Sequence, residues 1–467
     1  MKTIKTPIIP LEQTFVKVKD QPHELDYKAI CVFSVLGFFL DTDTYWKDRM
    51  VLPPASINKI DDVGYLISSE PWFEWYYKPK TTNLDKVTSE FSDLFEKIIG
   101  EQCINKKIIL PISGGLDSRT QAVALYKLGV QVNSYSYSFE DGYDEASISR
   151  KIADYCGFSF KGYTIKKEYL WSKIEELANI NKCYSEFTHP RQMAVIDDIE
   201  KLGDVFSLGH MGDLMFDSYD IQKSLGEKEL LIELKKKIVK RGRIELALLL
   251  WENWGINGDF QEYLDNRLLI LLKKIKIDNC SAKLRAFKSM YYVPRSTSVN
   301  LLTFSRNKEI YLPYYDNRMC KFICEIPEYL LNDRQIQIEY IKKTNPNVAK
   351  VVWQDAKPFN LFNYKLAKTP LRLPHRIINK FRRELNKILG VNYTQRNWEI
   401  QFLGKENDYK LKKHLFSKEL LSFVPVDTVE KITELFKNNN KVIYSDPIST
   451  LLTLSIFFKR YSQKYII

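Results

Sequence analysis

The most constraining feature of the sequence is an alternation of short apolar runs and helix-like runs between residues 107 and 157. "KIILPIS" has the length and composition of a buried strand, and "SRTQAVALYKLG" has helical spacing and a terminal glycine. "VQVNSYSYS" alternates like a strand, and "DEASISRKIADYCG" is typical of a helix closed by glycine. This order predicts a parallel sheet covered by helices. "GDVFSLGH", from Gly203, indicates another buried strand, after a helix expected in "RQMAVIDDIEKLG".

The flanking regions predict smaller additions to this α/β core. Residues up to about 85 are expected to be β-rich, because "YKAICVFSVLGFFLD" and "VGYLISS" are dense in β-branched and aromatic residues. A helix is expected from Leu84 to Ile99, closed by Gly100. Beyond about Ile221 the chain is mostly helical in pattern and rich in lysine. We therefore expect three parts, which are residues 1–85, residues 86–360 and a helical extension over residues 361–467.

Composition excludes several classes of protein. The 467 residues contain no uncharged apolar stretch near the roughly 18–20 residues that a membrane helix needs. "MKTIKTPIIP" lacks the apolar core of a signal peptide, so a cytoplasmic protein is expected. Seven scattered cysteines and five histidines give no disulfide framework or zinc pattern. The net charge of +12 favours an anionic partner, which could be a nucleotide, a nucleic acid, a glycan or a membrane surface.

The loop "LPISGGLDSRT", from Leu110, carries the strongest chemical signal. Between a strand and a helix, its glycines let a ligand approach the backbone, and its N–H groups and the helix dipole favour an anion. The loop lacks the Gly-Lys-Ser/Thr ending of a Walker loop and the third glycine of a dinucleotide fingerprint. Asp117 would repel phosphate unless a magnesium ion lay between them. The loop therefore predicts magnesium pyrophosphate and AMP-forming chemistry.

Four segments resemble one known family. "SGGLDS" is similar to the pyrophosphate loop of ATP-pyrophosphatases, and specifically to that of asparagine synthetase-type enzymes. "SLGHMGDLMFDSY", from Ser207, resembles the second motif of that family. "IYLPYYDNRMCKFICEIPEYLL" resembles its Pro-x-x-Asp-helix-Pro segment, and "VVWQDAKPF" its lysine segment. The resemblance covers roughly residues 85–467 and implies an α/β, parallel-sheet core of the adenine nucleotide α-hydrolase type.

The resemblance also implies roles for individual residues. Asp117 and Asp213 would hold magnesium, and Lys357 would stabilise charge on the ATP phosphates, so Asp117 and Lys357 are the expected catalytic residues. Adenine would lie at the carboxyl ends of the parallel strands, where ligands of such sheets bind. The expected nucleotide-binding residues are Ile112, Ser113, Gly114, Gly115, Leu116, Asp117, Ser118, Ser136, Leu208 and Gly209.

The chain departs from the family pattern in two places. The family usually begins with a glutaminase domain whose nucleophile is an N-terminal cysteine, whereas this chain begins Met-Lys-Thr and its first cysteine is Cys31. Since the stretch around Pro53 and Pro54 resembles the end of that domain, we interpret residues 1–85 as a catalytically empty remnant. In the second motif, His210 replaces a glutamate, and Asp-Glu has become Asp213-Leu214. These changes leave open whether the acyl substrate is aspartate.

The expected function is an ATP- and magnesium-dependent amide ligase that releases AMP and pyrophosphate. Its carboxylate substrate would be a small molecule, a sugar acid or a peptide. Its nitrogen would come from ammonia, an amine or a separate glutaminase. One alternative is a tRNA-modifying adenylating enzyme, although no RNA-binding motif is present and no nucleic-acid partner is expected. A non-catalytic ATP-binding protein is the other alternative.

Several residues and one basic helix each allow a structural and a functional interpretation. Lys357 could be a surface lysine, Asp213 a helix cap and His210 a structural histidine or a substrate contact. Tyr314 and Tyr315 could pack in the core or line an acceptor pocket, and Arg295 and Arg306 could bind a substrate carboxylate. "LRLPHRIINKFRRELNKILG", from Leu371 to Gly390, places apolar residues on one helical face and basic residues on the other. This basic helix could be a solvated face or could dock peripherally on an anionic surface.

Overall fold

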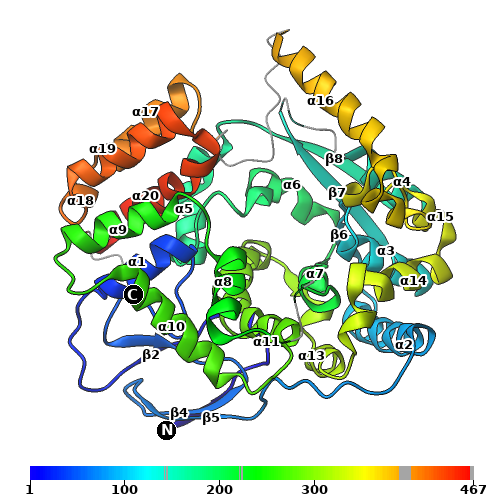
Figure 1. The fold of residues 1–467 in the computed structure, drawn as a ribbon, viewed down its shortest axis with the longest axis horizontal. Helices are drawn as coiled ribbons and strands as arrows, with labels where there is room; N and C mark the ends of the chain where they lie inside the picture. Colours follow the sequence, from blue (N-terminus) through cyan, green and yellow to red (C-terminus); the bar gives the residue numbers. More distant parts are fainter. Residues whose placement is uncertain (141, 143–145, 220, 222–223, 389–400, 463–467) are drawn as a thin grey trace.

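A five-stranded parallel sheet forms the centre of the fold. The computed structural model describes residues 1–140, 142, 146–219, 221, 224–388 and 401–462. In the sheet the strand order is β10-β9-β6-β7-β8, and every neighbouring pair is parallel. The parallel sheet predicted from the sequence is thus confirmed (Figure 1). The strands are β6 (Ile108–Pro111), β7 (Val132–Phe139), β8 (Ser159–Ile165), β9 (Val205–Ser207) and β10 (Glu309–Tyr311).

Helices connect and cover these strands. β6 leads into α3 (Asp117–Lys127) and β7 leads into α4 (Ala146–Tyr155), as parallel pairing requires. α14 (Gln335–Thr344) packs against α3 and against α2 (Leu84–Cys103), and α15 (Pro346–Lys350) packs against α4 (Figure 1). Asn83 caps α2 by accepting a hydrogen bond from the Lys86 N–H at 2.9 Å.

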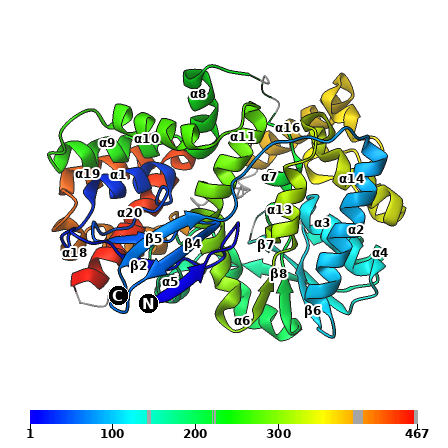
Figure 2. The ribbon, with the colours of Figure 1, turned by 90° about the horizontal axis from the view of Figure 1, so that it is seen from below.

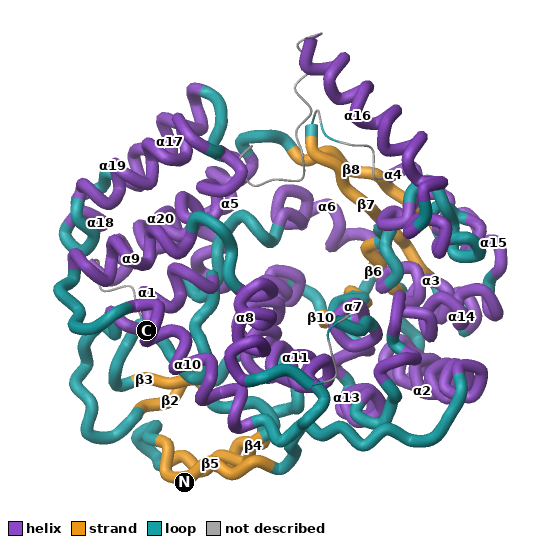
Figure 3. Tube along the Cα trace, in the orientation of Figure 1, coloured by secondary structure: helices purple, strands orange, loops and turns teal. Residues whose placement is uncertain are grey.

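The N-terminal region contains two small antiparallel sheets. β1 (Lys2–Lys5), β4 (Ser56–Ile60) and β5 (Leu66–Pro71) form one, and β2 (Phe15–Lys17) pairs with β3 (Arg49–Val51) in the other. Figure 3 shows that these strands gather apart from the parallel sheet. The expected β-rich character is therefore confirmed for these segments.

One segment of this region was predicted wrongly. Residues Tyr27–Leu36, expected as strand, form helix α1. The side chain of Asp26 accepts a hydrogen bond from the Ala29 N–H at 2.9 Å, and Gly37 ends the helix in the left-handed conformation. Because residues 29–36 are all buried, the helix shows no amphipathic period, and its β-branched and aromatic residues mimic a strand.

Three further differences concern element boundaries. α2 runs through Gly100 to Cys103 rather than ending at Ile99. The segment 191–202, expected as one helix, is a 3₁₀ turn, the single turn α6 (Ile196–Ile199) and another 3₁₀ turn. The edge strands β8 and β10 were not predicted.

The remaining helices lie between and beside the parallel sheet and the small N-terminal sheets (Figure 2). The N-terminal segment and the last helix meet in the core, where the Tyr45 and Phe457 rings stack with centroids 3.6 Å apart. No helix in the described ranges is long and apolar enough to cross a membrane. All seven cysteines are buried and unpaired. The helices that lie between and beside the sheets are α5 (Tyr169–Asn181), α7 (Gly212–Phe216), α8 (Glu227–Ile238), α9 (Arg243–Asn253), α10 (Phe260–Lys274), α11 (Cys280–Phe287), α12 (Ser298–Leu301), α13 (Asn317–Ile323), α16 (Leu373–Ile388), α17 (Lys405–Leu415), α18 (Lys418–Leu421), α19 (Val426–Glu434) and α20 (Lys441–Ser462).

Candidate active site

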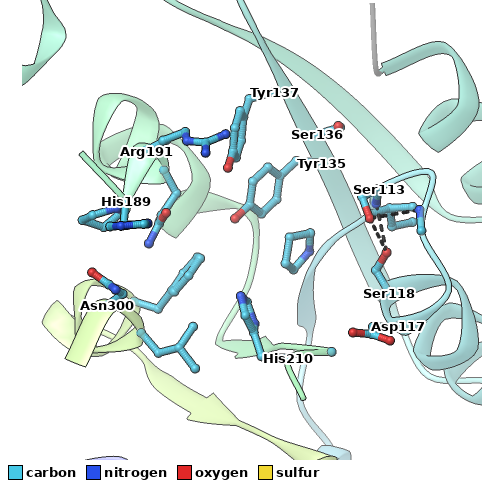
Figure 4. Close-up of a pocket in the computed structure, with 18 of the residues that line it drawn as sticks. Ser113, Asp117, Ser118, Tyr135, Ser136, Tyr137, His189, Arg191, His210 and Asn300 are labelled. Carbon is cyan, nitrogen blue, oxygen red and sulfur yellow. Dashed lines mark hydrogen bonds between the residues drawn. The ribbon is translucent and has the colours of Figure 1, made fainter. Parts of the chain in front are cut away.

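The glycine-rich loop lies between the end of β6 and the start of α3. The Ser113 N–H donates a hydrogen bond to Ser118 Oγ at 3.0 Å, and the two serine hydroxyls lie 3.1 Å apart (Figure 4). The Gly115 N–H donates to Ser113 Oγ at 3.3 Å. Leu116 precedes α3 and provides no side-chain cap. The first N–H groups of α3 are therefore available to an anionic ligand.

Arg119 fixes this loop to a distant part of the chain. Its buried guanidinium donates to the carbonyls of Val351 and Val352, both at 2.9 Å, and to that of Gly114 at 3.2 Å. The Gln354 N–H donates to the same Gly114 carbonyl at 3.1 Å. Since a buried guanidinium needs such acceptors, Arg119 connects the loop to residues 351–354 by hydrogen bonds.

The second motif follows β9, the strand beside β6, and presses against the first loop. A Cβ at Gly209 would lie 2.9 Å from the Asp117 carbonyl carbon, and one at Gly212 would lie 2.4 Å from Asp117 Oδ1. Both distances are shorter than real Cβ contacts, so only glycine permits this approach. The chain reverses its order between these two strands, and such a switch point opens a crevice at the strand ends.

Both carboxylate oxygens of Asp117 accept hydrogen bonds. Its Oδ1 accepts a hydrogen bond from the buried guanidinium of Arg334, and its Oδ2 accepts one from the Asp213 N–H at 3.2 Å. Arg334 also donates to Gln337 Oε1 at 2.9 Å. Sequence reasoning missed Arg334, because nothing in "LLNDRQIQ" distinguishes it from a surface arginine.

A cavity of about 480 Å³ opens over these loops. Seven of the ten residues expected to bind nucleotide line it, which are Ile112, Ser113, Gly115, Asp117, Ser118, Ser136 and Gly209. The cavity is also lined by Pro111, Tyr135, Tyr137, His189, Pro190, Arg191, Gln192, His210, Asn300, Leu301, Phe304, Gln354 and Asp355. The structure thus brings most of the predicted set together, and their roles stay predictions.

The other predicted residues lie near the cavity without lining it. Leu116 and Leu208 are fully buried. Gly114 packs against the side chain of Gln354. Asp213 is exposed at the start of α7, and its backbone N–H donates a hydrogen bond to the Asp117 carboxylate. Lys357 is half-buried, two residues beyond the cavity-lining Asp355.

The end of the cavity away from the loop is polar and aromatic. His189, Arg191 and Asn300 surround it, and the Tyr135 ring lies between them and the loop (Figure 4). The Tyr135 hydroxyl is buried and makes no hydrogen bond within the described residues. His210 is exposed to the cavity, and the surrounding protein lowers its pKa to about 4 by desolvation, against the opposing charge of Asp213. Its imidazole is therefore neutral at pH 7.

His189 contacts a buried cluster of charged side chains. His189 Nε2 lies 3.2 Å from Glu186 Oε2, and Glu186 Oε1 lies 2.7 Å from the Arg243 guanidinium on α9. Arg243 also pairs with Asp446 on α20 at 3.3 Å. Desolvation lowers the pKa of His189, while its hydrogen bond with Glu186 opposes that effect. Glu186, Arg243 and Asp446 therefore connect two helices to the cavity wall.

Four residues considered as substrate contacts have structural partners instead. Arg295 is buried and donates to the Phe39 carbonyl at 3.1 Å and to Gln13 Oε1 at 2.7 Å. Arg306 pairs with three carboxylates, those of Glu176, Asp197 and Glu200. Tyr314 and Tyr315 are buried and bond Gln337 and Ser298, which confirms the packing interpretation.

Comparison with known families agrees with this geometry. The family model described as "Asparagine synthase" matches residues 91–335, just over half of the chain, and the match includes both loops and Arg334. The chain belongs to the asparagine synthase family. Its parallel-sheet core is accordingly an asparagine synthase-type ATP-pyrophosphatase domain, and the family implies the use of ATP.

Solved structures give weaker likenesses. The NMN synthetase from Francisella tularensis is 10% identical with a TM-score of 0.23, over 44% of this chain and 92% of that one. The NH3-dependent NAD synthetase from Campylobacter jejuni is 14% identical with a TM-score of 0.22, over 42% and 93%. A glutamine-dependent NAD(+) synthetase from Cytophaga hutchinsonii is 10% identical with a TM-score of 0.22, over 59% and 62%. No curated protein sequence matches the chain.

Proposed function

We propose that this asparagine synthase family member is an amide ligase that activates a carboxylate with ATP and releases AMP and pyrophosphate. The observation that carries the proposal is the joint placement of the "SGGLDS" loop and the second motif around Asp117, at the open end of β6 and β9. Arranged in this way, the residues suit a pyrophosphate leaving group rather than a transferred γ-phosphate.

In the proposed first step, a substrate carboxylate oxygen attacks the α-phosphorus of ATP. The bond from that phosphorus to the bridging oxygen breaks, and pyrophosphate leaves with the electron pair. The loop N–H groups, the Ser113 and Ser118 hydroxyls and the start of α3 bind the departing oxygens. An amine or ammonia then attacks the acyl carbon, AMP leaves, and the amine loses a proton.

The residues around Asp117 fit a magnesium ion. Each Asp117 oxygen accepts one hydrogen bond and keeps a further lone pair, so an ion fits without displacing Arg334 or the Asp213 N–H. No group of three or more potential metal ligands occurs among the described residues, so ATP oxygens and water would complete the shell. Asp117 and Asp213 would hold the ion, which would neutralise phosphate charge when bound.

Arg334 is a second candidate for the cationic role that the family resemblance implies for Lys357. Neither side chain lines the cavity, but Arg334 contacts the Asp117 carboxylate, and no such contact of Lys357 occurs among the described residues. The polar end of the cavity, around His189 and Asn300, would hold the carboxylate or the amine. Residues 1–85 would supply no glutaminase activity, so nitrogen would come from ammonia, an amine or a separate glutaminase.

A substrate panel tests this function. The purified chain is incubated with ATP, Mg²⁺ and amino acids, uronic acids or peptides, with hydroxylamine as a general amine acceptor. We expect one or more acids to give AMP, pyrophosphate and hydroxamate in equal amounts. ADP as the product would contradict the proposal. AMP release that needs tRNA would favour the tRNA-modifying alternative, and no turnover with any acid would favour an ATP-binding protein.

A further inference from the structure

Helix α16 presents an unusual surface outside the cavity. It projects from the body of the molecule beyond the sheet (Figure 1). Six large apolar side chains on α16 and just before it are 45–70% exposed, namely Leu371, Leu373, Ile377, Ile378, Phe381 and Leu385. Such a cluster is unfavourable in water, because each side chain keeps apolar area in contact with solvent.

The two faces of this helix have opposite chemistry. Leu373, Ile377, Phe381 and Leu385 follow one another at four-residue spacing, so they form one stripe. Arg376 and Lys380 are exposed at positions rotated away from that stripe. Residues 371–388 contain six arginines and lysines and one glutamate. The helix therefore combines a continuous apolar face with a strongly cationic one.

This combination selects among the anionic partners that the net charge allows. A glycan or a nucleic acid would neutralise the basic face but leave the apolar stripe in water. An anionic bilayer satisfies both faces, since acyl chains receive the stripe while lipid headgroups pair with arginine and lysine. The 16 residues of α16 would lie in the membrane plane over about 24 Å.

We propose that α16 is a peripheral membrane anchor that binds anionic lipid bilayers. The inference rests on this surface and is independent of the adenylation chemistry. The segment just before α16 is connected to the cavity wall, because Arg372 donates a hydrogen bond to the carbonyl of the cavity-lining Asp355 at 2.7 Å. Docking through α16 therefore holds the cavity near the lipid surface.

Sedimentation with vesicles is the first test. The full chain should pellet with phosphatidylcholine vesicles that contain phosphatidylglycerol, and much less with phosphatidylcholine alone. Phe381→Glu should weaken this binding by about tenfold or more, because it removes an exposed ring that would insert among the acyl chains and adds a charge that anionic lipid repels. Ile270→Glu, on α10 and 55% exposed, is the matched control and should bind normally. Equal binding of both variants overturns the proposal.

A site-specific label gives a second readout that does not depend on affinity. Because all seven native cysteines are buried, Ile378→Cys and Lys380→Cys each add one accessible thiol for an environment-sensitive dye. Anionic vesicles should shift the emission at position 378 to the blue much more than at position 380. Equal shifts at both positions contradict insertion of the apolar face.

The same variants separate lipid from protein partners. If α16 instead covers a second copy of this chain, the wild type should be a dimer by analytical ultracentrifugation, and Phe381→Glu should be a monomer. That result, together with no vesicle binding, overturns the lipid assignment. A monomeric wild type that binds anionic vesicles supports it.

Discussion

At the residue scale, the site depends on how Asp117 is surrounded. The sequence shows that an acid lies in a phosphate loop, which already indicates a bound cation. It does not show that Arg334, 217 positions away, lies on the same carboxylate. A contact of this kind depends on how α14 packs against α3, and no local pattern records it.

Substitution of the two candidate cations distinguishes their roles. Arg334→Gln should lower the rate of AMP release by about 10²–10³-fold, the usual effect of losing one charge-stabilising group. Lys357→Gln should have a much smaller effect, since Lys357, unlike Arg334, makes no contact with Asp117 among the described residues. Steady-state rates with circular dichroism as a folding control measure this difference. The opposite order would restore the role predicted for Lys357.

His210 gives a pH-dependent prediction. Desolvation lowers its pKa from 6.5 to about 4, so between these values the unfolded chain binds a proton that the folded chain does not. The stabilisation from the neutral ring is present above about pH 6.5 and is lost as the pH falls toward 4.

Urea unfolding of the wild type and of His210→Gln measures this effect. The free energy of unfolding of the wild type should fall relative to that of the variant as the pH decreases through this range. Parallel pH profiles for the two proteins would show that the protein around the cavity does not lower the His210 pKa.

At the element scale, the elements with clear periods or turn signals were predictable. β6, α3, β7 and β9 lie where the sequence placed them. α1 was missed because full burial removes the helical period, and its cap at Asp26 was the signal that could have identified it. β10 has only three residues and is defined by pairing with β9, so no local period marks it.

The ionic cluster behind His189 shows how helices are connected to the site. Glu186→Gln should lower the free energy of unfolding by about 3 kcal/mol, because the buried Arg243 would keep only Asp446 as a charged partner. Denaturant unfolding measures the change.

A surface ion pair is the matched control for this substitution. Glu406→Gln, which breaks an exposed pair with Lys410, should cost less than about 0.5 kcal/mol. Equal losses of unfolding free energy for Glu186→Gln and Glu406→Gln would mean that the buried cluster stabilises the fold no more than an exposed ion pair does.

At the scale of the whole molecule, the predicted three-part division stays a prediction. The structure does show that one apolar core includes residues from the N-terminal segment, the parallel sheet and α20. Tyr45 illustrates this, since its ring stacks on Phe457 and its hydroxyl donates to the Cys183 carbonyl at 2.6 Å. The sequence could not reveal such contacts, because they join positions hundreds of residues apart.

The cavity is also a property of the whole molecule. The loop after β6 was predictable, whereas His189 and Asn300 come from segments without a recognisable motif. The sequence therefore predicts the activating half of the site and leaves its polar end undefined.

Exchange of labelled pyrophosphate into ATP is the most direct test of adenylation. With the acid identified from the substrate panel, the wild type should incorporate label only when that acid and Mg²⁺ are present. Asp117→Asn should reduce the exchange by about 10²-fold or more, while Asp198→Asn, an exposed control, should exchange normally. Exchange that does not require the acid, or that survives in Asp117→Asn, would contradict the account.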